Sequence, residues 1–118
     1  MDDVVMKEKR RFPRAIAKIK VTYTILNSVD ATPYEFGETV TEDISEGGLC
    51  MLIKEQLLED RLLYVNIQFA TQKENLLMLG KTVSVERDTE TGRNRARIKF
   101  VGMLPRGFGK LIASLKEN

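Results

Sequence analysis

The residues of this chain best suited to chemistry form a cluster of cations near its start. KEKRRFPR, residues 7–14, contains five basic residues and one acid. An arginine side chain is permanently charged and presents a planar fork of N–H donors that matches the oxygens of phosphates and carboxylates. A basic segment of this kind is typical of proteins that bind an anion, such as a nucleic acid, a membrane surface or a nucleotide.

A second polar stretch, EDISEGG at residues 42–48, lies in the acidic part of the chain. The net charge is only +2, yet Lys7 to Lys20 holds seven basic residues against one acid, and Glu35 to Asp60 holds eight acids against one base. Asp, Ser and Gly at such spacing are the usual residues of a turn, where their side chains satisfy local backbone groups. Taken alone, this stretch is explained by turn chemistry.

Several classes of chemistry are disfavoured by composition. The chain has no histidine and one cysteine, Cys50. The usual zinc ligand sets and the His-dependent nucleophilic triads are therefore not expected, and we expect no metal, no cofactor and no enzymatic activity. Cys50 lies within an apolar run and is expected to be a small core residue.

Length and hydropathy predict one soluble domain. The chain has 118 residues, of which 42% are hydrophobic and 31% charged, a size that allows one modest core. The sequence contains no apolar run of the ~20 residues that a membrane-spanning helix needs, and its polar start is unlike a signal peptide. We therefore expect a cytoplasmic location without membrane insertion.

Alternating hydrophobicity predicts strands in the first half of the chain. In IAKIKVTYTIL, every second residue from Ile19 to Ile25 is apolar, the pattern of a half-buried strand. Residues 27–37 are rich in Asn, Asp, Pro and Gly and predict a loop. Strands are predicted at residues 38–45 and 49–53 around a tight turn, followed by a polar connection at 54–61 with room for one helical turn.

The second half predicts three more strands, at residues 62–70, 76–88 and 95–103, the last two joined by a hairpin turn. Gly80 interrupts its strand pattern and predicts a bulge or bend. Six short strands at this spacing predict a mainly β fold, a six-stranded antiparallel barrel. Beyond Pro105, apolar residues recur at helical spacing and predict a C-terminal α-helix that covers an open end of the barrel. The alternative is that this helix binds a partner protein with its apolar stripe.

Together, the two polar stretches resemble the motifs of a known family. Arg10 and Arg14 form RxxxR, and Asp43, Ser45 and Gly48 form DxSxxG about 30 residues later. This pair, in this order, is similar to the signature of the PilZ domain family, which binds the bacterial second messenger cyclic di-GMP. The resemblance covers nearly the whole chain and implies a six-stranded barrel with a final helix. The arrangement expected for this chain is a flexible basic arm at residues 1–14 and one PilZ-like domain at residues 15–118.

The resemblance also implies a role for the arginines. Arg10 and Arg14 would clamp the ligand, with Arg11 as a nearby helper. A guanidinium can pair with phosphate oxygens or with O6 and N7 of guanine, and its flat face can stack on the base.

The DxSxxG residues would complete the site. Asp43 would accept hydrogen bonds from N1 and N2 of guanine, and the hydroxyl of Ser45 would bond phosphate or base. Gly48 would let the backbone approach the nucleotide closely or adopt a positive φ. Ile44, between them, should point into the core.

The mechanism implied is that of a non-catalytic receptor. Cyclic di-GMP would bridge the arm and the barrel, order the arm, and so change an interaction with a downstream protein partner of unknown identity. Ligand binding can shift this equilibrium only by its differential affinity for the ordered state.

Two alternatives remain open from the sequence. The first is a nucleic-acid-binding module, because the strand at residues 95–103 and the turn before it carry a basic stripe made of Arg93, Arg95, Arg97 and Lys99. The scarcity of exposed aromatic residues argues against it, and the stripe is also explained as a solvated face paired with Glu86 and Asp88. The second alternative is a PilZ-like adaptor that binds protein without a ligand.

Overall fold

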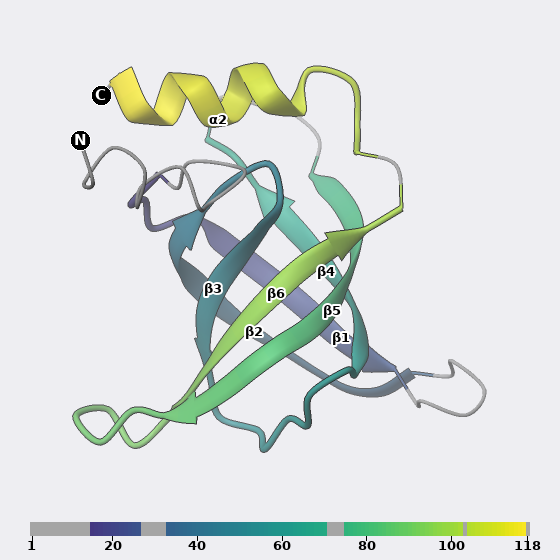
Figure 1. The fold of residues 1–118 in the computed structure, drawn as a ribbon, viewed down its shortest axis with the longest axis vertical. Helices are drawn as coiled ribbons and strands as arrows, with labels where there is room; N and C mark the ends of the chain where they lie inside the picture. The colour runs from purple at the N-terminus through teal and green to yellow at the C-terminus, as the bar shows by residue number, and fades with distance from the viewer. Residues whose placement is uncertain (1–14, 27–32, 71–74, 103, 118) are drawn as a thin grey trace, which may run out of the picture.

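The computed structural model describes residues 15–26, 33–70, 75–102 and 104–117 of the chain. These residues form six strands and one C-terminal helix (Figure 1). The elements are β1 (Lys20–Leu26), β2 (Pro33–Ile44), β3 (Gly48–Ile53), β4 (Leu62–Gln68), β5 (Leu76–Arg87), β6 (Asn94–Val101) and α2 (Phe108–Glu117). The predicted flexible arm at residues 1–14 lies outside the described residues.

The strands close into an antiparallel barrel in the order β1, β2, β3, β6, β5, β4, with β4 pairing back onto β1. Four of the pairings join strands that follow one another in the chain, whereas β3 with β6 and β1 with β4 join distant segments. Closure gives each strand a partner on both sides, which removes open sheet edges. The prediction of a mainly β fold, a six-stranded antiparallel barrel with a C-terminal helix, is confirmed.

The alternation predicted from the sequence sets the core. In β1, Val21, Tyr23 and Ile25 are buried while Lys20 and Thr22 are exposed. The interior is filled by side chains that alternate inward in this way from every strand, including Ile44, Met51, Ile53, Leu63, Val65, Ile67, Ala96 and Ile98. Burial of this apolar surface is the main stabilising contribution.

The structure corrects the predicted limits of the second strand. Residues 33–37 were predicted to be part of a loop, but they belong to β2 and pair with β1, Phe36 opposite Thr24. Gly37 permits this pairing because a Cβ there would lie 2.6 Å from Oη of Tyr23. Pairing with β1 therefore overrides the turn-forming composition of this segment.

Two further predictions were wrong. Gly80 was predicted to mark a bulge or a bend, and the bulge is wrong, since Gly80 pairs in register with Leu63 and Phe100 and the irregularity of β5 lies between Thr82 and Ser84. A Cβ at residue 80 would overlap Cγ2 of Ile98 on the neighbouring strand, which explains the glycine by packing. Residues 54–61, all described, contain no helix: they end in a turn at residues 59–60, where Asp60 has a φ of 62° and backbone hydrogen bonds join Asp60 and Arg61 to Thr82 of β5.

Helix α2 covers one end of the barrel (Figure 1). Phe108 and Ile112 are 1% exposed, and the ring of Phe108 packs edge-to-face on those of Phe69 and Phe100. The apolar stripe is therefore used inside the domain, and the alternative that it binds a partner protein is wrong. The helix begins at Phe108, later than Pro105, whose carbonyl accepts a 3.1 Å hydrogen bond from the Phe108 N–H. In the described part of the chain, no helix has the length and apolar character needed to cross a membrane.

Candidate functional site

The loop that joins β2 to β3, residues 45–47, carries the middle of the DxSxxG motif, while Asp43 lies at the end of β2 and Gly48 at the start of β3. The N–H of Ser45 donates to the carbonyl of Gly48 at 2.8 Å, and the N–H of Gly47 donates to Oγ of Ser45 at 3.1 Å. Ser45 is only 6% exposed. Its hydroxyl thus stabilises the turn, as turn chemistry predicts for Ser in this position.

Gly48 is required by the barrel itself. A Cβ at residue 48 would overlap the carbonyl oxygen of Ile98 and lie 3.1 Å from Cα of Lys99, both in β6. Its φ is not positive: the described glycines with positive φ are Gly92, Gly102 and Gly107. Of the two roles expected for Gly48, the positive φ is therefore wrong, and the close approach of strand β6 explains the absence of a side chain.

Asp43 reaches the outer surface because β2 contains a bulge before it. The register of β2 with β3 shifts between Thr41 and Asp43, which leaves Glu42 as the extra residue. Thr41 and Ile44 are both fully buried. Strict alternation from Thr41 would place Asp43 inside and Ile44 outside, so the bulge reverses them. The prediction that Ile44 points inward is confirmed.

An outer row of three residues runs across the barrel from Asp43. Asp43 pairs with Cys50 on β3, and Cys50 pairs with Arg97 on β6. Cys50 is 1% exposed but alternates with the core residues Leu49 and Met51, so it is buried on the outer side of the sheet. Burial raises the pKa of the Cys50 thiol to about 11, an effect that the charge of Arg97 opposes and that of Asp43 reinforces. Both charges therefore lie close to this thiol.

The bulged Glu42 engages the next residue of the basic stripe. Nε of Arg95 donates to Oε1 of Glu42 at 2.7 Å, and its Nη2 lies 3.3 Å from Oε2. Nη2 also lies 3.5 Å from Oδ1 of Asp88. The hydrogen bond that Arg95 donates to Glu42 lowers the pKa of the Glu42 carboxyl group. The two carboxylates beside Arg95 balance its positive charge.

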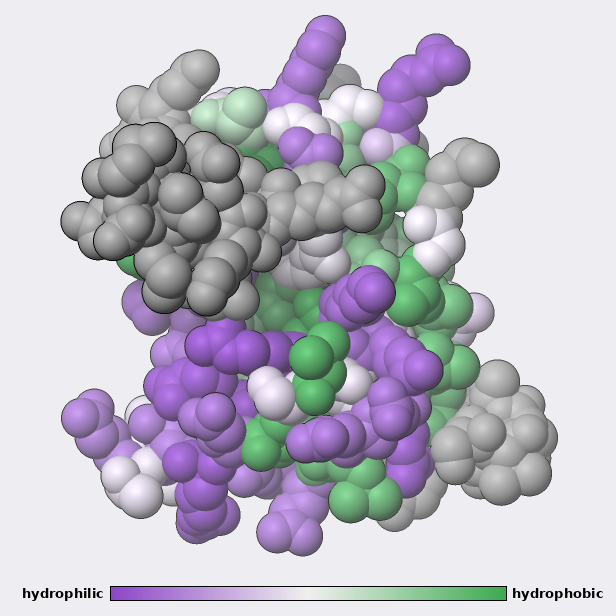
Figure 2. All heavy atoms as spheres, in the orientation of Figure 1, coloured by the Kyte–Doolittle hydropathy of each residue, from purple (hydrophilic) through white to green (hydrophobic). Residues whose placement is uncertain are grey.

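The basic stripe is consequently divided. Arg95 forms ion pairs with Glu42 and Asp88, and the pair with Asp88 was predicted by the interpretation of the stripe as a solvated face. Arg97 instead lies beside Cys50, in the row that begins at Asp43. In Figure 2, hydrophilic side chains dominate the front of the barrel below α2, the face where β3, β5 and β6 lie. Sequence reasoning noted Arg97 only as part of a stripe, because the pairing of β3 with β6 joins segments about 50 residues apart.

The chain that follows the RxxxR motif is anchored on β2 beside the loop. Ala15 and Ile44 form an antiparallel bridge through hydrogen bonds of 2.7 and 2.9 Å. Thr41 of β2 holds the next residues through three hydrogen bonds. Its backbone N–H donates to the carbonyl of Ile19. Its hydroxyl Oγ1 accepts from the N–H of Ile19 and donates to the carbonyl of Ala17. These five hydrogen bonds fix residues 15–19. Arg10, Arg11 and Arg14 themselves lie outside the described residues.

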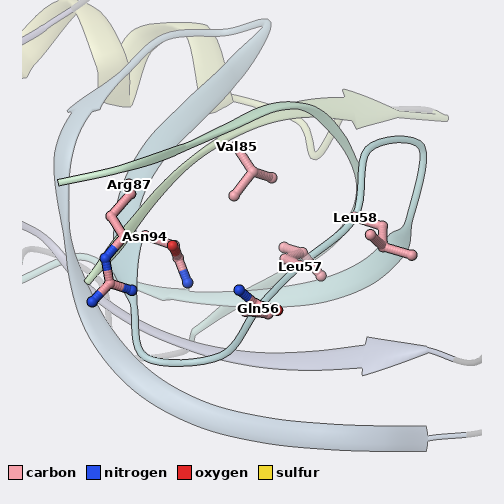
Figure 3. Close-up of a pocket in the computed structure, with 6 residues that line it drawn as sticks. All are labelled: Gln56, Leu57, Leu58, Val85, Arg87 and Asn94. Carbon is pink, nitrogen blue, oxygen red and sulfur yellow. The ribbon is translucent and has the colours of Figure 1, made fainter. Parts of the chain in front are cut away.

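A cavity of about 250 Å³ lies at the other end of the barrel (Figure 3). It is lined by residues 56–58, which precede β4, and by Val85, Arg87 and Asn94. Asn94 pairs with Ile53 at the far end of β3 from Gly48, a separation of five residues or about 16 Å along a strand. This cavity is therefore separate from the DxSxxG loop.

Comparison with known proteins identifies the domain. The family model described as "PilZ domain" matches residues 8–117, which include both motifs. A search of curated protein sequences finds no significant match.

Among solved structures, the inhibitor of motility MotI (DgrA) of Bacillus subtilis superposes with a TM-score of 0.70 at 13% identity, over 92% of this chain and 49% of MotI. The PilZ domain of YcgR from Escherichia coli, solved with c-di-GMP, gives a TM-score of 0.65 at 17% identity over 92% of both chains. YcgR in complex with c-di-GMP gives 0.67 at 22% identity over 92% of this chain and 46% of that one. The chain thus spans about half the length of MotI and of that YcgR structure.

Proposed function

The chain belongs to the PilZ domain family, and from this premise we propose that it is a non-catalytic receptor for cyclic di-GMP. The observation that carries the proposal is the bridge between Ala15 and Ile44. Arg14 is joined to Ala15 by one peptide bond, so their Cα atoms are about 3.8 Å apart. Ile44 lies between Asp43 and Ser45 of the second motif. The bridge therefore holds the residue that follows RxxxR beside the DxSxxG motif, which supports a site shared by the two motifs.

The two motifs supply complementary chemistry for this ligand. Cyclic di-GMP is a dianion with two guanine bases, so its receptor needs forked cations for phosphate and for O6 and N7 of guanine. Arg10 and Arg14 provide these forks, assisted by Arg11. Asp43 supplies the carboxylate that accepts from N1 and N2 of guanine, and the Ser45 and Gly48 backbone forms the floor of the site.

Arg97 adds a cation from the barrel itself. It lies two strands from Asp43, about 10 Å across the sheet, with the small buried Cys50 between them. We assign it a contact with the ligand from the barrel side of the site. Titration of an Arg97→Ala variant should show an affinity at least tenfold weaker, since a charge-assisted fork contributes ~1.5 to 3 kcal/mol.

Signalling follows from ordering of the arm. Residues 1–14 close on the barrel when the ligand bridges the arginines and the DxSxxG loop, and the new surface changes the interaction with a downstream protein. Titration calorimetry with cyclic di-GMP tests the binding step directly and reports the stoichiometry. The Arg10→Ala and Arg14→Ala variants should each lose at least tenfold in affinity, whereas Arg93→Ala, in the exposed turn before β6, should bind like the wild type.

Two results would contradict this proposal, the first in its assignment of the arm arginines and the second in the function itself. The first is unchanged affinity in both arm variants, which would remove the clamp. The second is absence of cyclic di-GMP binding together with an oligonucleotide affinity that falls steeply with salt, which would favour the nucleic-acid-binding alternative.

A further inference from the structure

Glu46, at an unspecified position of the DxSxxG motif, lies against the C-terminal helix. A Cβ placed on Gly109 would be 3.1 Å from Oε1 of Glu46 and 3.2 Å from Oε2. Gly109 is the second residue of α2, and the first turn of α2 has no acidic residue. Since the free N–H groups of a helix start carry partial positive charge, Glu46 supplies from the loop the negative charge that this turn lacks.

A second connection links the same loop to the same helix. The carbonyl of Gly47 accepts a 2.8 Å hydrogen bond from the N–H of Phe100. The ring of Phe100 packs edge-to-face on Phe108, with 5.6 Å between centroids and an angle of 79°. The loop is thus connected to the first turn of α2 through a carboxylate and through an aromatic pair.

The helix is held mainly at this first half. Phe108 and Ile112 are its fully buried side chains, whereas a cavity of about 310 Å³ lies between Ser114 and Leu115 and the end of the barrel. Gly107, directly before the helix, has a φ of 82° that only glycine adopts readily. Leu111 and Leu115 pack against the core but are only partly buried. A helix that is packed less closely along its second half and that follows a glycine joint is among the parts of a fold that open most easily.

We propose that α2 responds to the ligand, with Glu46 as the positioning residue that couples the DxSxxG loop to the helix. This inference rests on the proposed function as a cyclic di-GMP receptor. A ligand that contacts Ser45 and Gly48 restricts the motion of the loop that carries Glu46. The contact between Glu46 and the first turn of α2 is then stabilised, so this turn opens less often. Thermodynamic linkage then requires the reverse effect, in which a loosened helix lowers the affinity for the ligand by the same factor.

Hydrogen–deuterium exchange of residues 108–115, measured with and without cyclic di-GMP, tests the coupling. In the wild type, the ligand should slow exchange in this segment at least threefold. In Glu46→Gln the slowing should disappear, and calorimetry should show an affinity three- to tenfold weaker. Gly109→Ala, whose new methyl displaces the Glu46 carboxylate, should behave in the same way. Glu90→Gln, an exposed carboxylate in the turn between β5 and β6, is the matched control and should keep both effects.

The outcomes separate this inference from the function on which it rests. If the wild type binds cyclic di-GMP and exchange in residues 108–115 is unchanged or faster, α2 does not respond as proposed, and the receptor function stands. Full slowing in both Glu46→Gln and Gly109→Ala would exclude Glu46 as the coupling residue. If the wild type does not bind cyclic di-GMP, the receptor function and the coupling both fail.

Discussion

Gly48 of β3 lies opposite Lys99 of β6 and so close to the carbonyl oxygen of the preceding Ile98 that residue 48 has no space for a Cβ. The glycine of DxSxxG is therefore fixed by the barrel, whatever it contributes to a ligand. The motif combines a residue that closes the fold, Gly48, with one that the fold turns outward, Asp43. Loss of binding in a Gly48 variant would for this reason be evidence about folding first.

Gly48→Ala should destabilise the domain by about 2 to 3 kcal/mol, because β3 and β6 must separate locally to admit the methyl group. Urea denaturation of the ligand-free protein measures this change. Lys99→Ala, which alters the exposed partner of Gly48 in β6, is the control and should stay within about 0.5 kcal/mol of the wild type. A stable Gly48→Ala variant that fails only in ligand binding would show that the glycine serves the ligand instead.

Cys50 should be almost inert in the native protein. It is 1% exposed, and its pKa is raised to about 11, so only about 0.1% is thiolate at pH 8. Alkylation by iodoacetamide at pH 8, followed by mass spectrometry, should be at least 100-fold slower in native protein than in concentrated urea. Rapid native alkylation would contradict the closed packing between Asp43 and Arg97.

The course of the strands could be predicted where one side of a strand faces the core. Alternation in β1 and β6 marked their inward residues correctly, because burial selects apolar side chains at every second position. The same reasoning failed for Gly80 and for residues 33–37, since both are decided by what lies on the neighbouring strand: Ile98 for the first and β1 for the second. A single sequence does not contain that information locally.

The residues of the candidate site also differ in whether the sequence alone could predict them. The motif pattern predicted Asp43 as a site residue, but the outward direction of this side chain depends on the bulge at Glu42. Arg97 and Glu46 acquire their places only when β3 pairs with β6 and α2 closes the barrel. Contacts between distant segments therefore assemble the parts of the site that no spacing rule reveals.

The pair of Glu42 and Arg95 should make stability depend on pH. The hydrogen bond from Arg95 lowers the pKa of Glu42 in the folded state, so its contribution is complete above the ordinary value of 4.5 and is lost as the pH falls through the lower folded value. Glu42→Gln should therefore be less stable than the wild type by about 0.5 to 1 kcal/mol at pH 7, and this difference should shrink below pH 4.5. Urea denaturation at pH 7 and in acid measures the difference. Glu86→Gln, whose side chain lies opposite Arg95 in register, is the control, and an equal loss in both variants at pH 7 would argue against a specific pair.

Asp43→Ala should separate base recognition from charge attraction. The wild type should prefer cyclic di-GMP over cyclic di-AMP, since a carboxylate can accept from N1 and N2 of guanine and adenine offers no such pair of donors. Asp43→Ala should lose that preference by at least tenfold, measured by competition calorimetry, while the cations still attract both dinucleotides. The fold should tolerate the change because Asp43 lies on the outer surface of β2, next to the fully buried Ile44 that anchors the strand. Asp43→Asn is the sharper companion variant: it keeps the size of the side chain and one acceptor oxygen but removes the negative charge, so it should show an intermediate preference. Undiminished discrimination in Asp43→Ala would mean that guanine is recognised elsewhere, and that Asp43 serves only the turn.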